Sequence, residues 1–235
     1  MKPATREPPR ASRRDAFRLR HLWAPDRYGA LLLLIVAAIL SFGLLGDQRW
    51  GRSASLVLVG AMVALALKVA ALPGRWMLAL AWPIAIALLG AVSSGLEPLD
   101  RLSRLAYESA LVLLLLTAPV AIAVRVARQP RIGVATVVGA VCVYLLVGFV
   151  FAGLYALVAT AASAPFFASG TAATGLDDLY FSYVTLTTVG YGDLTPGGDL
   201  GRMLAVTEAL MGQVYLVTVV ALLVANVGRE RSRPG

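Results

Sequence analysis

The chain has 235 residues, of which 59% are hydrophobic and only 14% are charged, and its formal net charge is +8. This apolar content exceeds that of soluble globular domains and predicts an integral membrane protein. The single cysteine and the single histidine exclude an intrachain disulfide framework and a metal site built from several such residues.

The first 27 residues are rich in proline and arginine and predict a disordered, basic cytoplasmic arm that contacts anionic lipid headgroups. The pair Arg13-Arg14 before an apolar stretch is also a feature of export signals. However, no small-residue cleavage site follows Leu45, so we expect the first apolar stretch to stay in the protein as a membrane helix.

Six apolar segments follow, and each is long enough to cross a bilayer as a helix. They are Tyr28–Leu45, Ser55–Leu72, Trp76–Val92, Tyr107–Val124, Gly133–Thr160 and Leu200–Val227. If both termini are cytoplasmic, sixteen of the 21 Lys and Arg residues fall on the cytoplasmic side. This distribution follows the positive-inside rule, so the basic charge indicates topology and not a nucleic-acid surface. Residues 229–235 then form a short cytoplasmic tail.

The fourth segment ends in arginines at every third position, a spacing typical of membrane voltage sensors. Arg125, Arg128 and Arg131 carry this pattern, but Ala110–Val124 before them holds no charge and Pro130 interrupts the series. The second and third segments contain no acidic residue that could pair with a sensor arginine inside the membrane. We therefore expect residues 28–127 to form a four-helix membrane domain without steep voltage sensitivity.

Residues 161–176 are rich in alanine, serine and glycine and predict an outer loop. Asp177 and Asp178 come next and are suited to the positive end of a short helix over about Asp178–Thr187. We expect this helix to enter the membrane from outside, so that its negative C-terminal end favours a cation at the membrane centre. Solvated loop charges are the alternative interpretation of the two aspartates.

Residues Thr187–Asp193 read Thr-Thr-Val-Gly-Tyr-Gly-Asp. Glycine adopts positive φ at little cost, so glycines at alternate positions allow successive carbonyls to point the same way. Rings of such carbonyls can replace the water shell of a potassium ion. The side chains of Val189 and Tyr191 would turn outward, and the Thr188 hydroxyl would add an oxygen at the inner end. The segment resembles the selectivity filter of potassium channels; a surface turn built on Gly-Tyr-Gly is the alternative.

The resemblance implies an all-α integral membrane fold with six transmembrane helices and a re-entrant pore helix and filter between helices five and six. Residues 128–228 would form the pore domain, and four chains would surround one axis as a homotetramer. We expect passive potassium conduction in a bacterial inner membrane, with no cofactor, no nucleic-acid partner and no enzymatic reaction. The expected potassium-coordinating residues are Thr188, Val189, Gly190, Tyr191 and Gly192.

The helix after the filter resembles the inner helix of the two-helix bacterial potassium channel. Gly212 falls at the position of the hinge glycine in that channel, which implies a bend that opens an inner gate. Close packing against the fifth segment is the alternative reason for a glycine in this helix. By the same register, and because positions three and seven residues apart share a helical face, Gln213, Leu216 and Val220 are expected to line the inner cavity.

Val184 stands where that relative has a glutamate behind the filter, so Asp193 lacks a carboxyl partner. Glu208 lies inside a membrane segment, where a carboxylate is costly unless it is paired, protonated or hydrated. We expect a hydrogen bond from Glu208 to Thr185 or Tyr183; a direct role in conduction or proton sensing is the alternative. The predicted filter support comprises Thr187, Val184, Asp193 and Glu208.

Bacterial single-pore potassium channels whose leading helices carry no sensor match these features best. A voltage-gated potassium channel and a weakly selective cation channel remain alternatives. A potassium transporter subunit would need four pore-loop repeats in one chain, and this sequence contains one.

Overall fold

The computed structural model describes residues 27–44, 49–70, 101–128 and 133–231. Over these ranges the chain forms six α-helices and one isolated β-bridge, between Phe167 and Pro196. The helices are α2 (Arg27–Leu44), α3 (Arg49–Ala70), α5 (Arg101–Ala127), α6 (Val134–Ala162), α7 (Gly175–Leu186) and α8 (Asp199–Arg231). The predicted third membrane segment, Trp76–Val92, lies outside the described residues, as do nearly all of the predicted N-terminal arm and residues 232–235 of the tail.

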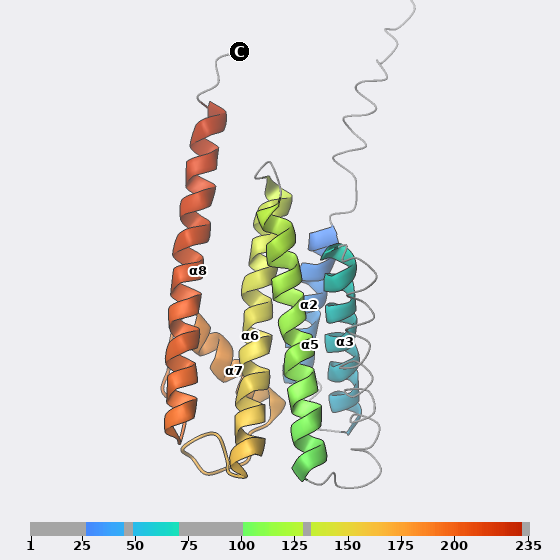
Figure 1. Ribbon diagram of the computed structural model, residues 1–235, viewed down its shortest axis with the longest axis vertical. Helices are drawn as coiled ribbons and strands as arrows, with labels where there is room; N and C mark the ends of the chain where they lie inside the picture. The colour runs from blue at the N-terminus through green and yellow to red at the C-terminus, as the bar shows by residue number, and fades with distance from the viewer. Residues whose placement is uncertain (1–26, 45–48, 71–100, 129–132, 232–235) are drawn as a thin grey trace, which may run out of the picture.

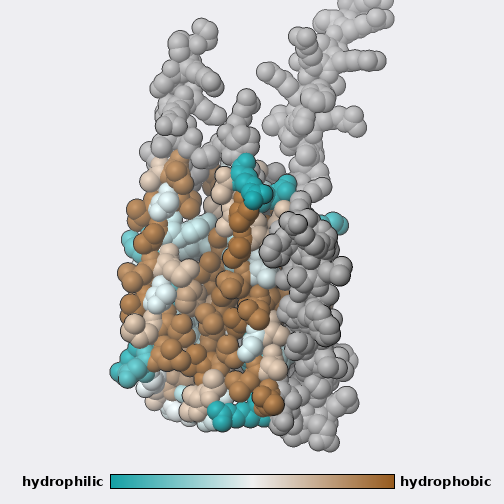
Figure 2. All heavy atoms as spheres, viewed as in Figure 1, coloured by the Kyte–Doolittle hydropathy of each residue, from teal (hydrophilic) through white to brown (hydrophobic). Residues whose placement is uncertain are grey.

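Five long helices run side by side along the long axis of the molecule, and the short helix α7 lies inclined between α6 and α8 (Figure 1). Each predicted apolar segment within the described ranges is confirmed as a helix. Among the described residues, two helices are long and apolar enough to cross a membrane, Arg104–Ala127 and Val134–Ala162. Tyr28–Leu44 and Val57–Ala70 are shorter apolar helices. Figure 2 shows hydrophobic side chains over the middle of the molecule and hydrophilic ones near its two ends.

Two groups of buried side chains hold the helices together. The larger core joins α2, α3, α5 and α6 through fully buried residues such as Leu31, Met62, Ile122 and Leu146. Burying each such side chain stabilises the packed helices by about 1.5–3 kcal/mol where water is the alternative environment. The smaller core is aromatic and lies beside α7; it consists of Phe151, Tyr155, Phe166, Phe167 and Phe181.

Two phenylalanines of the predicted outer loop belong to that aromatic core. Phe166 and Phe167 are 4% and 3% exposed, and their rings pack against Phe181 of α7. Backbone hydrogen bonds from Ala168 to Thr195 and from Gly197 to Phe166 tie the loop to the segment before α8. The loop therefore closes over α7 and fixes the segment on which the candidate site lies.

Candidate functional site

Helix α7 begins with a capping box and starts three residues before the predicted position. The Thr174 hydroxyl accepts a hydrogen bond from the Asp177 N–H at 3.2 Å, and the Asp177 carboxylate accepts one from the Thr174 N–H at 2.8 Å. Asp177 therefore serves the helix N-terminus, as the sequence predicted. Asp178 also lies in the first turn of α7, but its side chain is buried and its Oδ1 atom has no hydrogen-bond partner among the described residues.

In the segment after α7, every second residue from 188 to 192 has a positive φ angle. Gly190 and Gly192 have φ angles of +54° and +80°, which confirms that both glycines adopt positive φ. Thr188 also has a positive φ, +60°, although a threonine resists this conformation. The three positions 188, 190 and 192 are thus in the left-handed region, and backbone strain at Thr188 is held in place by the structure around it.

Backbone hydrogen bonds orient this segment against α7. The N–H of Thr188 donates to the Thr185 carbonyl at 2.9 Å. The N–H groups of Val189 and Gly190 both donate to the Val184 carbonyl, at 2.9 and 3.3 Å. In a trans peptide the preceding carbonyl points opposite to the N–H, and the described residues contain no cis peptide. The carbonyls of the three successive residues Thr187, Thr188 and Val189, here the carbonyl row, therefore point away from α7.

The sequence assigned Val184 to the filter support, and the structure shows that its contribution is the backbone carbonyl. The Asp193 side chain also has a partner that the sequence did not reveal, because the Tyr180 hydroxyl donates to its Oδ2 at 2.8 Å. This hydrogen bond raises the pKa of the exposed Tyr180 phenol. The bond spans the predicted filter segment, so both ends of that segment are connected to α7.

The side chains of Val189 and Tyr191 lie on the α7 side of the segment. They line a groove of about 460 Å³ together with residues of α7, among them Tyr183 and Val184. Val189 is 52% exposed and Tyr191 is 71% exposed in the single chain. The side chains and the carbonyl row thus face different surroundings, and the described part of the chain leaves both side chains exposed.

Helix α6 holds α7 through hydroxyl groups. The Tyr183 hydroxyl donates to the Leu145 carbonyl at 2.8 Å, and the Tyr144 hydroxyl donates to the Leu186 carbonyl at 3.0 Å. Gly148 permits this approach, because a Cβ atom there would lie 2.6 Å from the Tyr183 ring. Thr187, another predicted support residue, donates to the Tyr183 carbonyl at 2.6 Å and continues the last turn of α7.

Glu208 is fully buried between α6, α7 and α8. Its two carboxyl oxygens contact the hydroxyls of Ser182 and Tyr155, so the predicted partners Thr185 and Tyr183 are wrong. The Ser182 oxygen also lies 2.8 Å from the Gly148 carbonyl. A hydroxyl has one proton to donate, and Ser182 faces two oxygens. The sequence predicts that Glu208 lies on α8. It does not predict the rotation of α7 about its axis, and that rotation decides which α7 side chain contacts Glu208.

Gly212 packs against the last residue of α7. A Cβ atom at this position would lie 2.1 Å from the Leu186 carbonyl oxygen, so α8 approaches α7 more closely than any other residue type permits. The sequence offered the fifth segment as the packing alternative, and the structure shows α7 as the neighbour. Helix α8 continues through Gly212 to Arg231, and the hinge role stays a prediction.

The predicted cavity residues follow Gly212 on α8. Gln213 and Leu216 are exposed in the single chain, with Leu216 at 40%. The side chain of Val220 lies outside the described part of the structure. Their position on the uncovered surface of α8 is compatible with a cavity lining, which also stays a prediction.

Comparisons with known proteins give matches to this part of the chain. Residues 139–229, which include most of α6, all of α7 and most of α8, match the family model described as "Ion channel". A two pore potassium channel of rice is 52% identical over 52 residues, which are 22% of this chain and 14% of the relative. The two-pore potassium channel 1 of Arabidopsis thaliana is 49% identical over 49 residues, or 20% of this chain and 14% of that protein.

A bacterial relative matches over a similar length. The protein LctB of Geobacillus stearothermophilus is 44% identical over 54 residues, which are 23% of this chain and 40% of LctB. The similarity thus spans less than half the length of each of these relatives. Residues 139–229 thus match an ion channel domain, and shorter stretches of the chain are similar to potassium channels.

Proposed function

We propose that the chain is one subunit of a potassium-selective channel that conducts K⁺ passively across a membrane. The observation that carries the proposal is the row of carbonyls of Thr187, Thr188 and Val189, which points away from α7. Backbone oxygens in this arrangement coordinate a dehydrated potassium ion. In the proposal the row continues through Gly190 and Tyr191, and α7 is a re-entrant pore helix whose C-terminal end faces the ion pathway.

Four chains complete the site, because one filter segment supplies only one wall of a coordinating ring. The single chain supports this assembly through its uncovered apolar side chains at the filter and on α8. On α8 they include Met203, Val206, Leu210, Val214 and Val217. In the homotetramer these surfaces face neighbouring subunits, the central cavity or lipid.

The proposed subunit crosses a bacterial inner membrane six times, with both termini in the cytoplasm and the basic arm near anionic lipids. The charge distribution and the bacterial relative LctB support this arrangement. Opening is not steeply voltage-dependent, because Ala110–Val124 of α5 carries no charge that a membrane potential could move. Gly212 acts as the gate hinge in this proposal.

Reconstitution of the purified chain in planar bilayers tests the function. With potassium and sodium gradients in opposite directions, the reversal potential should follow the potassium gradient. Equal permeability to both ions would instead identify a weakly selective cation channel. A steep rise of conductance over a few millivolts would identify a voltage-gated channel, and native mass spectrometry should detect four copies of the 24.7 kDa chain.

A further inference from the structure

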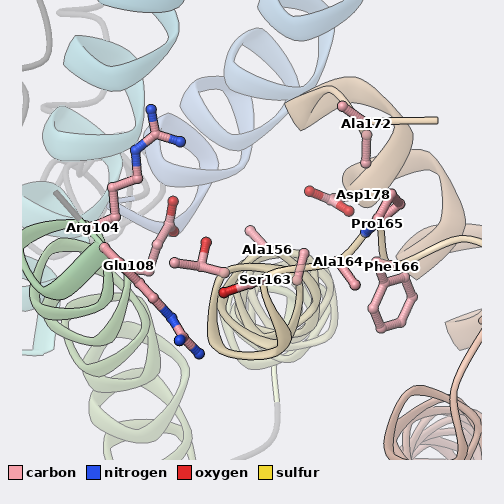
Figure 3. A pocket seen from close by; sticks show the side chains of 13 residues that line it. Arg104, Glu108, Ala156, Ser163, Ala164, Pro165, Phe166, Ala172 and Asp178 are labelled. Carbon is pink, nitrogen blue, oxygen red and sulfur yellow. The ribbon is translucent and has the colours of Figure 1, made fainter. Parts of the chain in front are cut away.

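A second hollow of the molecule lies away from the filter, where α5 begins, α6 ends and α7 begins. This α5–α7 cleft has a volume of about 580 Å³. Alanine side chains of α6 and of the loop before α7 form much of its wall, as Ala156, Ala164 and Ala172 show (Figure 3). The cleft is therefore large enough for a hydrated ion and separate from the carbonyl row.

Two carboxylates point into the cleft from different helices. Glu108 enters from α5 and Asp178 from the first turns of α7, so that they face each other across the open space (Figure 3). Asp178 is only 7% exposed, and its Oδ1 has no hydrogen-bond partner among the described residues. An unpaired buried carboxylate oxygen is costly, which indicates that a group other than the described residues satisfies it.

The remaining charges around the cleft do not satisfy Asp178. Arg101 also lines the cleft, but its guanidinium donates to the Ala161 carbonyl at 2.6 Å, at the end of α6. Arg104 lies one turn before Glu108 on α5, and its side chain lies near Glu108, across the open space from Asp178 (Figure 3). The neighbouring Asp177 is turned toward Thr174 and is already occupied as a helix cap.

We propose that the α5–α7 cleft binds a divalent cation through the carboxylates of Glu108 and Asp178, with water completing its coordination shell. Carboxylate oxygens are preferred ligands of Mg²⁺ and Ca²⁺, and Mg²⁺ commonly keeps several waters while binding one or two carboxylates. The two carboxylates together carry a formal charge of −2, against +2 from Arg101 and Arg104 of α5 at the same cleft. The positive charge of Arg104 opposes the ion and makes the site weak, in the range of about 10⁻⁴–10⁻³ M that extracellular calcium modules show.

The bound ion would connect α5 to α7. Because α7 carries the filter segment at its other end, the site links the helices before the pore to the part of the chain that holds the carbonyl row.

Titration of the full chain in lipid nanodiscs with MnCl₂, followed by electron paramagnetic resonance of the free ion, tests the site without measuring conduction. We expect one bound Mn²⁺ per chain that Mg²⁺ and Ca²⁺ displace. Glu108→Gln and Asp178→Asn should each weaken binding about tenfold or more, as loss of a metal-supporting group commonly does. Asp199→Asn is the matched control, because Asp199 is a fully exposed carboxylate at the start of α8.

Each outcome decides the proposal. Equal binding by the wild type, Glu108→Gln and Asp178→Asn would overturn it. A pH-dependent stability that Asp178→Asn removes, in a chain that binds no Mn²⁺, would also overturn it, because the two carboxyls would then share a proton. The two variants lie on separate helices and keep side-chain volume, so parallel loss in both, with normal elution of the assembled protein, supports a shared ion.

Discussion

The hydrogen bonds around Glu208 lead to a prediction that distinguishes a neutral carboxyl group with a structural role from an ionised carboxylate. Replacement by glutamine should preserve the assembled protein, whereas replacement by alanine should destabilise it. Tyr155 donates to one carboxyl oxygen, and Ser182 has two neighbouring oxygens but one proton. A glutamine amide can accept from Tyr155 and donate to Ser182, which completes the set of donors and acceptors.

The expected magnitude follows from burial. Glu208→Ala leaves the fully buried Tyr155 hydroxyl without its partner, which costs about 1–3 kcal/mol. The cavity left by a large side chain costs about 2–5 kcal/mol more. The alanine variant should therefore lose about 3–8 kcal/mol per chain, a large part of the stability of an ordinary domain. The glutamine variant is isosteric and should lose less than about 1.5 kcal/mol.

Thermal denaturation of the assembled protein in detergent, followed by size-exclusion chromatography, measures this difference. Tyr155→Phe supplies a further check. In the Glu208→Ala variant the Tyr155 hydroxyl has already lost its partner, so Tyr155→Phe should lower stability less there than in the wild type. If the glutamine variant is as unstable as the alanine variant, an ionised carboxylate is required and the reasoning fails. If the alanine variant is as stable as the wild type, the buried network contributes nothing.

Three further variants or conditions test other contacts. Gly212→Ala should force α8 away from the Leu186 carbonyl, lower stability by about 1–3 kcal/mol in thermal denaturation and alter channel opening in bilayers. Gly190→Ala places a side chain at φ +54°, at a cost of about 1–2 kcal/mol per chain, so reversal potentials should show reduced potassium selectivity. Gly198→Ala is the control: its Cβ would lie in open space, so reversal potentials should not change. The pKa of Asp178 is about 7 in the folded chain against an ordinary 3.8, so without divalent cations the melting temperature should rise as the pH falls from 8 to 5, and Asp178→Asn should remove that part of the rise.

The helices that the structure describes were predictable because long apolar runs permit little else in a membrane. The start of α7 was less predictable. The two aspartates suggested a start near position 178, whereas the cap is Thr174, a residue type common at helix N-termini. The partner of Glu208 also has a signal in the sequence. Tyr155 lies inside an apolar segment, where a tyrosine needs a partner for its hydroxyl. The rotation of α7, which selects Ser182 for Glu208, depends on packing that no local pattern contains.

Three glycines show how the rest of the protein holds the helix that carries the filter segment. A Cβ atom at each would approach an atom of a neighbouring helix to within 3 Å, so each glycine marks a place where α7 is in close contact with another element. The pairs are Gly175 with Phe42, Gly148 with Tyr183 and Gly212 with Leu186. They join the start of α7 to α2, its middle to α6 and its end to α8. Because α2 comes before the predicted pore domain, that earlier part of the chain packs directly against the helix from which the carbonyl row extends.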